Sequence, residues 1–386
     1  MDTVTVKNKP VLGKGPFLRT VDEGKNSTNK MMLNVLIALT PIIIFAWVKN
    51  GLLPFIKYDN VSVITMLWPL LFVIVGGSTS VVLEALYFYF FKGIKNFKDV
   101  MIATKDSFAV IPGVLLALVL PIYTPMWILM LGCLVANILF KMLFGGFGHN
   151  IFNPALIGYA FIMATFAGSL GGAYNSPFDL YNTTASVTPL ANYAKDISAS
   201  YDVIVGTYGS LWDFFLGTIP GSLGETSSLL CVVAFIYLVV TKTINWYVPT
   251  IYVGTVFGIT WIIGAVNGQS GIWYPLFNIL SGGLLFGAVF MATEPVTAPR
   301  TPNGKVIFAL FLGVFTVLFR IVGSMPEGVA TSILFMCLFS GIIDRFCAKI
   351  RATANDKKYF TKNIIKYACV GLLIAGIAAY AIFKTM

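Results

Sequence analysis

The chain has 386 residues, of which 57% are hydrophobic and only 11% are charged, and its mean hydropathy is +0.84. Soluble domains usually carry about 25% charged residues, so this composition excludes an ordinary soluble protein and indicates an integral membrane protein. The net charge is +10, but the basic residues gather in short segments between apolar runs. That distribution is the positive-inside pattern of membrane proteins and argues against nucleic acid as a partner.

Eleven apolar segments are candidates for membrane spans, since about 20 apolar residues cross the hydrocarbon core as a helix. In chain order they are 32–49, 61–91, 107–122, 125–143, 155–169, 228–240, 246–265, 276–292, 304–323, 327–345 and 364–383. The segments 107–122 and 228–240 are short, so we expect each to be tilted, broken or partly re-entrant. The sequence therefore predicts an all-α polytopic membrane protein with ten transmembrane helices and an extra C-terminal helix.

The charges between these segments predict how the chain is oriented. If the polar N-terminal segment lies in the cytoplasm, the basic connections fall on the same side, as the positive-inside rule requires. These basic residues are Lys92, Lys95, Lys98, Lys105, Lys141, Lys242, Arg300, Lys305, Lys349, Arg351, Lys357, Lys358 and Lys362. The long loop 170–227 then lies outside, where it carries five acidic residues and the single basic residue Lys195. We expect no cleavable signal peptide, because the first thirty residues are polar and contain six lysines or arginines.

The sequence also contains an internal repeat. The run "GVLLALVLPIYTP" at 113–125 resembles "GGLLFGAVFMATEPVTAP" at 282–299, and each is followed by a span, a Gly-rich turn and another span. Five spans per half would make the halves inverted in the membrane, an arrangement that usually places a binding site at the interface between them. The predicted units are a cytoplasmic N-terminal segment (1–31), a first five-helix repeat (32–169), an external loop (170–227), a second five-helix repeat (228–346), and a basic linker with an extra transmembrane helix (347–386).

The turn 145–154 carries the strongest local signal for binding. Its glycines let the backbone approach a planar ligand, and its two asparagines can each offer an amide donor and a carbonyl acceptor to a heteroaromatic edge. The residues concerned are Gly145, Gly146, Gly148, Asn150 and Asn153. On the local sequence alone a structural role is favoured, with Asn153 as a helix N-cap and Pro154 as the first helical residue. His149 is the only histidine, which excludes a multi-histidine zinc or haem site.

Charged residues within the spans are rare, and the two that stand out are Glu84 and Arg320. Glu84 is a candidate for a proton or cation pathway. The alternatives are contact with a partner subunit or a carboxylate that reaches the membrane surface. The run "MATEPVTAPRTPNGK" at 291–305 is either a cytoplasmic turn or an unwound segment whose carbonyls line a cavity. The five cysteines include no CxxC pair, and four lie in apolar spans, so neither an iron–sulfur site nor a disulfide framework is predicted.

The loop run "NTTASVTPLANY" places Thr188 directly before Pro189. A residue before proline favours an extended backbone, which would expose the threonine hydroxyl. The chain has no Ser/His/Asp set to activate that hydroxyl. The residues alone favour an ordinary external turn, with modification by another enzyme as the alternative.

Four runs together resemble the RnfD/NqrB family, whose members are membrane subunits of the Rnf ferredoxin:NAD⁺ oxidoreductase and of the Na⁺-translocating NADH:quinone reductase. They are "GGFGHNIFNPALIGYAF", "VTPLANY", "MATEPVTAPRTPNGKVIF" and "FRIVGSMPEGVATSILFMCLFSGIIDRF", in the order found in the family, and the resemblance covers about residues 20–348. The runs "KDSFAVIPGVLLALVLP" and "TPLANY" look closer to the RnfD branch than to the NqrB branch, and the long N-terminal extension of the NqrB branch is missing.

The resemblance implies two inverted five-helix halves and two flavins. Family members carry FMN on a threonine in a "SGAT"-like motif, attached through a phosphodiester bond by a separate flavin transferase. That motif falls on 185–188, here "ASVT", so the resemblance makes Thr188 the attachment site despite the altered residues before it. The asparagine turn is similar to the family's site for a second, non-covalent flavin, usually riboflavin. Asn150 and Asn153, with the three glycines, thereby become binding candidates.

The function implied is that of an electron-carrier subunit in the bacterial cytoplasmic (inner) membrane. Electrons would pass between the covalent FMN and the second flavin, with ion movement belonging to the whole complex. Because the chain has no cysteine cluster and no dinucleotide fingerprint, ferredoxin and NAD⁺ are expected to bind to partner subunits, some integral, some peripheral and some flavinylated. The alternatives are the NqrB-type subunit of the quinone reductase and, from another class, a solute channel or transporter built from inverted repeats.

Overall fold

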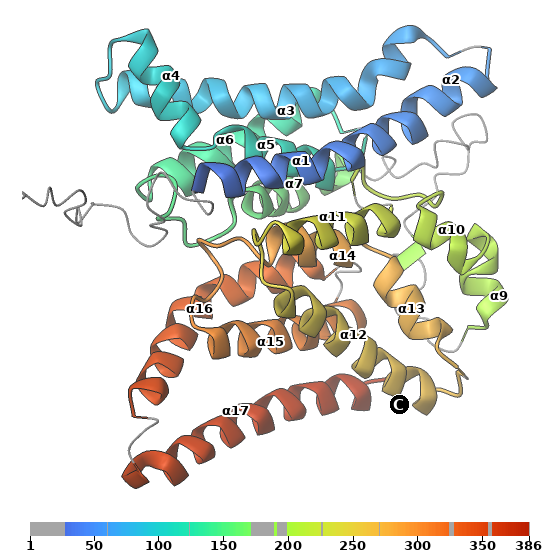
Figure 1. Cartoon of the computed structure of the whole chain (residues 1–386). Helices are drawn as coiled ribbons and strands as arrows, with labels where there is room; N and C mark the ends of the chain where they lie inside the picture. The colour runs from blue at the N-terminus through green and yellow to red at the C-terminus, as the bar shows by residue number, and fades with distance from the viewer. Residues whose placement is uncertain are drawn as a thin grey trace, which may run out of the picture.

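The computed structural model describes residues 28–59, 61–122, 124–170, 189–190, 199–224, 227–269, 271–323, 328–353 and 357–385. Within these residues all regular structure is helical and no strand is present. Figure 1 shows two groups of helices packed against each other, one from the N-terminal and one from the C-terminal part of the chain. The long helices of each group lie roughly alongside one another.

The first group runs from Thr28 to Leu170. Its elements are α1 (Thr28–Trp47), η1 (Val48–Leu52), α2 (Leu53–Lys57), α3 (Val63–Phe90), α4 (Phe97–Asp106), α5 (Val110–Val119), α6 (Met126–Leu134), η2 (Val135–Met142) and α7 (Pro154–Leu170). The elements η1 and η2 are π-helical and continue the helices before them.

The connection and the second group follow. The connection contains α9 (Tyr201–Ile204), the 3₁₀ turn η3 (Gly206–Tyr208) and α10 (Leu211–Leu216). The second group consists of α11 (Ser228–Val240), α12 (Tyr247–Val266), α13 (Trp273–Leu280), α14 (Leu284–Phe286), the π-helical η4 (Gly287–Met291), α15 (Pro302–Ile321), α16 (Val329–Ala352) and α17 (Lys357–Phe383).

Helix length and apolar surface make this a polytopic membrane protein. Five helices are long and apolar enough to cross a membrane, at Thr28–Lys57, Val63–Phe90, Tyr247–Val266, Pro302–Ile321 and Tyr359–Phe383. Two bent pairs raise the number of candidate spans to seven if each pair is one span. Large apolar side chains also point outward, such as Ile64 and Leu372, which are 68% and 73% exposed. Many exposed apolar side chains of this kind suit hydrocarbon rather than water.

The two bent pairs occupy matching places in the two groups. In the first group α4 and α5 meet at 52°, and in the second α13 and α14 meet at 63°. We call the residues between them the first break (107–109) and the second break (281–283). The first break lies at the start of the segment 107–122, for which a tilted, broken or re-entrant helix is expected. The segment 228–240 forms one continuous helix, and the sequence does not predict the break at 281–283.

The two groups are joined through α1 and α11, which lie side by side (Figure 1). Asn34 of α1 donates to the Thr243 hydroxyl at 2.9 Å and accepts from the Tyr237 hydroxyl at 3.4 Å. The first of these contacts is buried and the second is partly buried, so they fix the register of the two helices more specifically than apolar packing alone.

The predicted C-terminal extra helix is present as α17, at the edge of the second group (Figure 1). It contacts α15 and α12, and the Asn303 amide donates to the Tyr367 hydroxyl at 2.8 Å. The expected basic linker is largely helical, because α16 continues to Ala352 and α17 begins at Lys357. Within the most apolar stretch of α17 only 6% of the residues are buried. Most of this helix therefore faces outward.

Within the first group, α3 and α5 approach closely because glycines meet at the crossing. A Cβ atom added to Gly113 would overlap both the carbonyl oxygen of Gly76 and the Ser80 hydroxyl. No side chain fits there without moving the backbone. The crossing places the first break beside the C-terminal half of α3, where Glu84 lies.

We expect Gly113→Ala to destabilise the protein by about 1–3 kcal/mol, as overpacking does in a tight core. Gly254→Ala in α12 is the matched control, because a Cβ atom there meets nothing within 4 Å and alanine favours helix over glycine. Thermal unfolding of the two purified variants in detergent measures the difference. Equal melting temperatures would contradict this account of the crossing.

Candidate functional site

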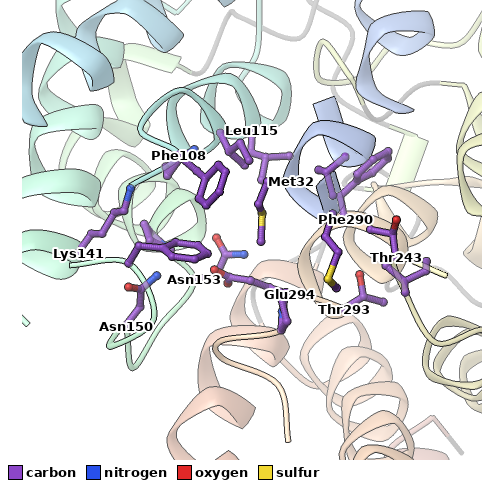
Figure 2. Close-up of a pocket in the computed structure, with 18 of the residues that line it drawn as sticks. Met32, Phe108, Leu115, Lys141, Asn150, Asn153, Thr243, Phe290, Thr293 and Glu294 are labelled. Atoms are coloured by element: carbon purple, nitrogen blue, oxygen red, sulfur yellow. The ribbon is translucent and has the colours of Figure 1, made fainter. Parts of the chain in front are cut away.

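A small apolar cavity lies between the two helix groups, and its wall includes Asn150 and Asn153 (Figure 2). We call it the asparagine cavity. Phe108, Leu115 and Lys141 come from the first group, and Phe290 and Glu294 from the second. The cavity has a volume of about 70 Å³ and adjoins a second cavity of about 250 Å³, with which it shares Met31, Thr243, Ile244, Thr293 and Pro295. Together they just reach the roughly 300 Å³ at which ligand sites begin.

The asparagine turn combines a structural cap with an open binding group. Asn153 Oδ1 accepts from the backbone N–H of Leu156 at 3.3 Å, and α7 begins at Pro154. The predicted N-cap is therefore confirmed, although Asn153 also lines the cavity. Asn150 is only 7% exposed, and its Oδ1 has no hydrogen-bond partner. A buried acceptor without a donor is costly, so this atom is the clearest sign of a ligand that carries an N–H or O–H group.

The three glycines of the turn have a conformational role in the structure. Gly145, Gly146 and Gly148 have φ angles of 117°, 88° and 90°, which disfavour other residues. None of them is on the cavity wall. They shape the turn so that Asn150 and Phe147 face inward. The sequence suggested instead that the backbone of the glycines would itself approach a bound ring.

The first break forms another wall of the cavity. Phe108 has a φ of 52°, a left-handed conformation that is strained for an aromatic residue. Its ring lies edge-on to Phe147, with the ring centroids 5.0 Å apart. Strained residues persist only where their surroundings fix them, and they cluster at functional sites.

The surroundings that fix Phe108 are a buried ion pair. Lys141 Nζ lies 2.5 Å from Glu84 Oε1 and donates to the carbonyl oxygen of Ser107 at 2.7 Å. The Ser107 hydroxyl donates to Glu84 Oε2 at 2.5 Å. Glu84 and Lys141 are 0% and 1% exposed. Both alternatives considered for Glu84, a partner contact and a carboxylate reaching the surface, are thus wrong, because its partner is Lys141 within the chain.

The second break has a cation at the corresponding place. Arg320, at the end of α15, donates to the carbonyl oxygen of Asn278 at 2.5 Å and to that of Ser281 at 3.4 Å. Four residues earlier, Thr316 is buried and hydrogen-bonded to Tyr252 at 2.6 Å. In the first group Asn137, four residues before Lys141, is buried and donates to Ser80 Oγ at 2.8 Å. Both η2 and α15 thus carry a buried polar residue and, one turn later, a cation that binds a serine carbonyl at a break.

The segment after η4 closes the cavity from the second group. It is a non-helical turn after η4, and several of its residues line the two cavities. Burial raises the pKa of the Glu294 carboxyl from 4.5 to about 7, against the opposing effects of Thr297, Lys141 and Asn153. The Asp344 carboxylate accepts from the backbone N–H groups of Arg300 and Thr301 at 2.8 and 2.9 Å, which anchors the turn to α16.

Other predicted residues lie outside the cavity or outside the described part of the chain. Thr188 is not among the described residues, although 189–190 are. Leu190 is fully buried next to Gly282 at the second break. His149 is exposed, and in the described residues no group of three His, Cys, Asp or Glu residues could hold a metal ion. Cys133, Cys231, Cys337 and Cys347 are buried and Cys369 is exposed. The predicted spans differ at two of these positions, because they include Cys369 and leave out Cys347.

We expect Lys141→Met to destabilise the protein by about 3–5 kcal/mol, since removing one partner leaves an uncompensated buried charge. The double variant Glu84→Gln/Lys141→Met should recover most of that loss, because no charge is then left in the interior. Thermal unfolding of the two single variants and the double variant gives the coupling free energy. Additive effects of the single changes would show that the two groups do not interact.

Comparison with known proteins places these features in a family. The sequence matches the NQR2, RnfD, RnfE family over residues 14–352, so the match ends with α16, and α17 lies beyond it. The chain is 35% identical to the D component of the proton-translocating ferredoxin:NAD(+) oxidoreductase complex of Clostridium ljungdahlii, over 89% of this chain and 96% of the relative. It is 34% identical to the D component of the Na(+)-translocating ferredoxin:NAD(+) oxidoreductase complex of Acetobacterium woodii, over 83% and 90%.

Similarity extends to a second kind of complex. The chain is 36% identical to the B component of the Na(+)-translocating NADH-quinone reductase of Chromohalobacter salexigens, over 69% of this chain and 65% of the relative. The family match covers most of the chain and includes the breaks, both buried cations and the asparagine turn. The chain belongs to the NQR2, RnfD, RnfE family.

Proposed function

We propose that this chain is the RnfD subunit of an ion-translocating ferredoxin:NAD⁺ oxidoreductase complex in a bacterial cytoplasmic membrane, where it carries electrons between two flavins. The subunit assignment is supported by the two relatives from such complexes, which the chain matches over more than four fifths of its length. The observation that carries the flavin part is the unpartnered Oδ1 of Asn150 in a buried cavity between the helix groups.

The finer topology is ten spans in two inverted halves, followed by α17 as an eleventh. The corresponding elements are α1 and α11, α3 and α12, the bent pairs α4/α5 and α13/α14, α6 with η2 and α15, and α7 and α16. Lys141 binds the carbonyl of Ser107, and Arg320 binds that of Ser281. This structural correspondence supports the internal repeat more strongly than the sequence similarity between 113–125 and 282–299 does. In this arrangement the N-terminus and the asparagine cavity lie on the cytoplasmic side and the loop 170–227 lies outside.

The asparagine cavity is the proposed site of the non-covalent flavin, as riboflavin or a close relative. Its apolar walls suit an aromatic ring system, and Asn150 and Asn153 would hold the polar edge of the ring. When bound, the flavin would accept one electron at a time and pass it on. The chain's own part is to exclude water, to orient the ring and to set its potential.

Thr188 is the proposed site of the covalent FMN. The supporting observation is the position of Leu190, two residues later, which is buried against Phe277 and close to Gly282. Leu190 would therefore hold the residues just after Thr188 near the second break. A flavin transferase would attach the FMN, and partner subunits would bind ferredoxin and NAD⁺ and complete the ion pathway.

A second candidate is the corresponding NqrB-type subunit of a Na⁺-translocating NADH:quinone reductase, which the 36% identity to a component of such a reductase favours. The two complexes differ in their electron donor and acceptor. Offering the purified whole complex either reduced ferredoxin with NAD⁺ or NADH with a quinone separates them. Reduction of NAD⁺ supports the first candidate, and reduction of the quinone supports the second.

In-gel fluorescence of the denatured chain, produced together with a flavin transferase, tests the covalent site. We expect a fluorescent wild-type band that is lost in Thr188→Ala, because only that hydroxyl carries the phosphodiester bond. Thr184→Ala, in the same run of sequence, is the matched control and should remain fluorescent. A fluorescent Thr188→Ala band would exclude this site, and a dark wild-type band would exclude covalent flavin.

Flavin content of the native chain tests the asparagine cavity. Replacing Asn150 by Leu should weaken binding of the non-covalent flavin about tenfold, since a hydrogen bond to a buried acceptor is worth about 1–3 kcal/mol. Asn267→Leu is the control, because Asn267 bonds only its own helix and does not line the cavity. Titration of flavin-depleted protein with riboflavin gives the Kd. Equal Kd values for the two variants would place the flavin elsewhere.

A further inference from the structure

We propose that Lys141 sets the reduction potential of the molecule bound in the asparagine cavity, and that Glu84 and Ser107 hold the Lys141 ammonium group in place. The inference rests on the proposed function, because it requires an electron-accepting flavin in that cavity. It also gives Glu84 a different role from the ion pathway suggested by its position in a span.

Lys141 has a donor available for a ligand. An ammonium group has three N–H donors, and Lys141 uses one on Glu84 Oε1 and one on the carbonyl oxygen of Ser107. The side chain lines the asparagine cavity (Figure 2). The remaining N–H can therefore point toward a bound ring without loss of either existing contact.

Glu84 balances this charge from behind. Its Oε1 contacts Lys141 and its Oε2 accepts from the Ser107 hydroxyl, so each carboxylate oxygen has a partner. Glu84 is fully buried and is not on the cavity wall. Lys141 belongs to the cavity wall and Glu84, on α3, does not, so the positive end of the ion pair lies on the cavity side.

The same contacts fix the shape of the wall. Ser107 is bonded through both its hydroxyl and its carbonyl oxygen, and it immediately precedes Phe108 in its left-handed conformation. These contacts fix Ser107 and thereby keep the Phe108 ring against Phe147. Charge and shape on this side of the cavity depend on one set of three residues.

A positive charge at the cavity wall stabilises the reduced flavin more than the oxidised flavin. An added electron leaves negative charge on the ring, and the interaction with a nearby cation is strong where water is excluded. The electron comes from the partner redox subunits and is passed on to them. Lys141 keeps its protons throughout, and no bond at Lys141 forms or breaks. Among the described residues of the wall, the other charged side chain is Glu294, which comes from the second helix group.

The test is a redox titration of the non-covalent flavin bound to the purified chain, followed by its absorbance. Lys141→Met should weaken binding of the reduced relative to the oxidised flavin at least tenfold, a fall of about 59 mV in a one-electron potential. Glu84→Gln/Lys141→Met should show the same fall, and it keeps the measurement possible if the single variant does not fold. Lys141→Arg keeps the positive charge. The ratio of its binding constants for the reduced and the oxidised flavin should stay within about threefold of the wild-type ratio.

Lys49→Met is the matched control. Lys49 is also a buried lysine on a π-helical segment, and it donates to the carbonyl oxygen of Ile219 at 2.5 Å, but it does not line the cavity. Its replacement should leave the potential unchanged. A potential unchanged in Lys141→Met or in the double variant, with flavin bound, would overturn the inference. A wild-type chain that binds no flavin at all would instead overturn the proposed function.

Discussion

The structure depends on how a membrane protein satisfies backbone groups where a helix is interrupted. Away from water, a free carbonyl costs several kcal/mol, and the two bent pairs each free several of them. Lys141 and Arg320 meet this demand by donating to carbonyl oxygens at the ends of α4 and α13. Cations are also favoured at the C-terminal end of a helix by the helix dipole. A cation thus supports each break, Lys141 from η2 at the first and Arg320 from α15 at the second.

The two breaks differ in what surrounds the cation, and this difference gives them different chemistry. Glu84 neutralises Lys141 at the first break, where the asparagine turn and the segment after η4 enclose a cavity. At the second break the cation lies beside Gly282, against which Leu190 packs. Interrupted helices line a site in many transporters, and here such helices are proposed to hold electron carriers.

Local sequence predicted the helices well and their partners poorly. Hydropathy located the apolar helices because each needs its own run of apolar residues. Asn153 followed by Pro154 predicted the start of α7 because a cap acts within one turn. Glu84 was recognisable as an unusual charge, but Lys141 was counted among the basic residues of a connecting segment, and their pairing spans 57 residues. The break at 281–283 was missed because paired glycines are also common within transmembrane helices.

The sequence by itself determined that the chain is a membrane protein of about ten apolar helices, which family it resembles, and which threonine and asparagines to suspect. These properties depend on composition, spacing and short motifs, which are local. Only the tertiary structure decided that Asn150 Oδ1 is left without a donor, that the turn glycines shape the wall without lining it, and that Glu84 is held by Lys141 and Ser107. The physical reason is that burial and pairing depend on which distant segments pack together, and no local pattern in the chain records that.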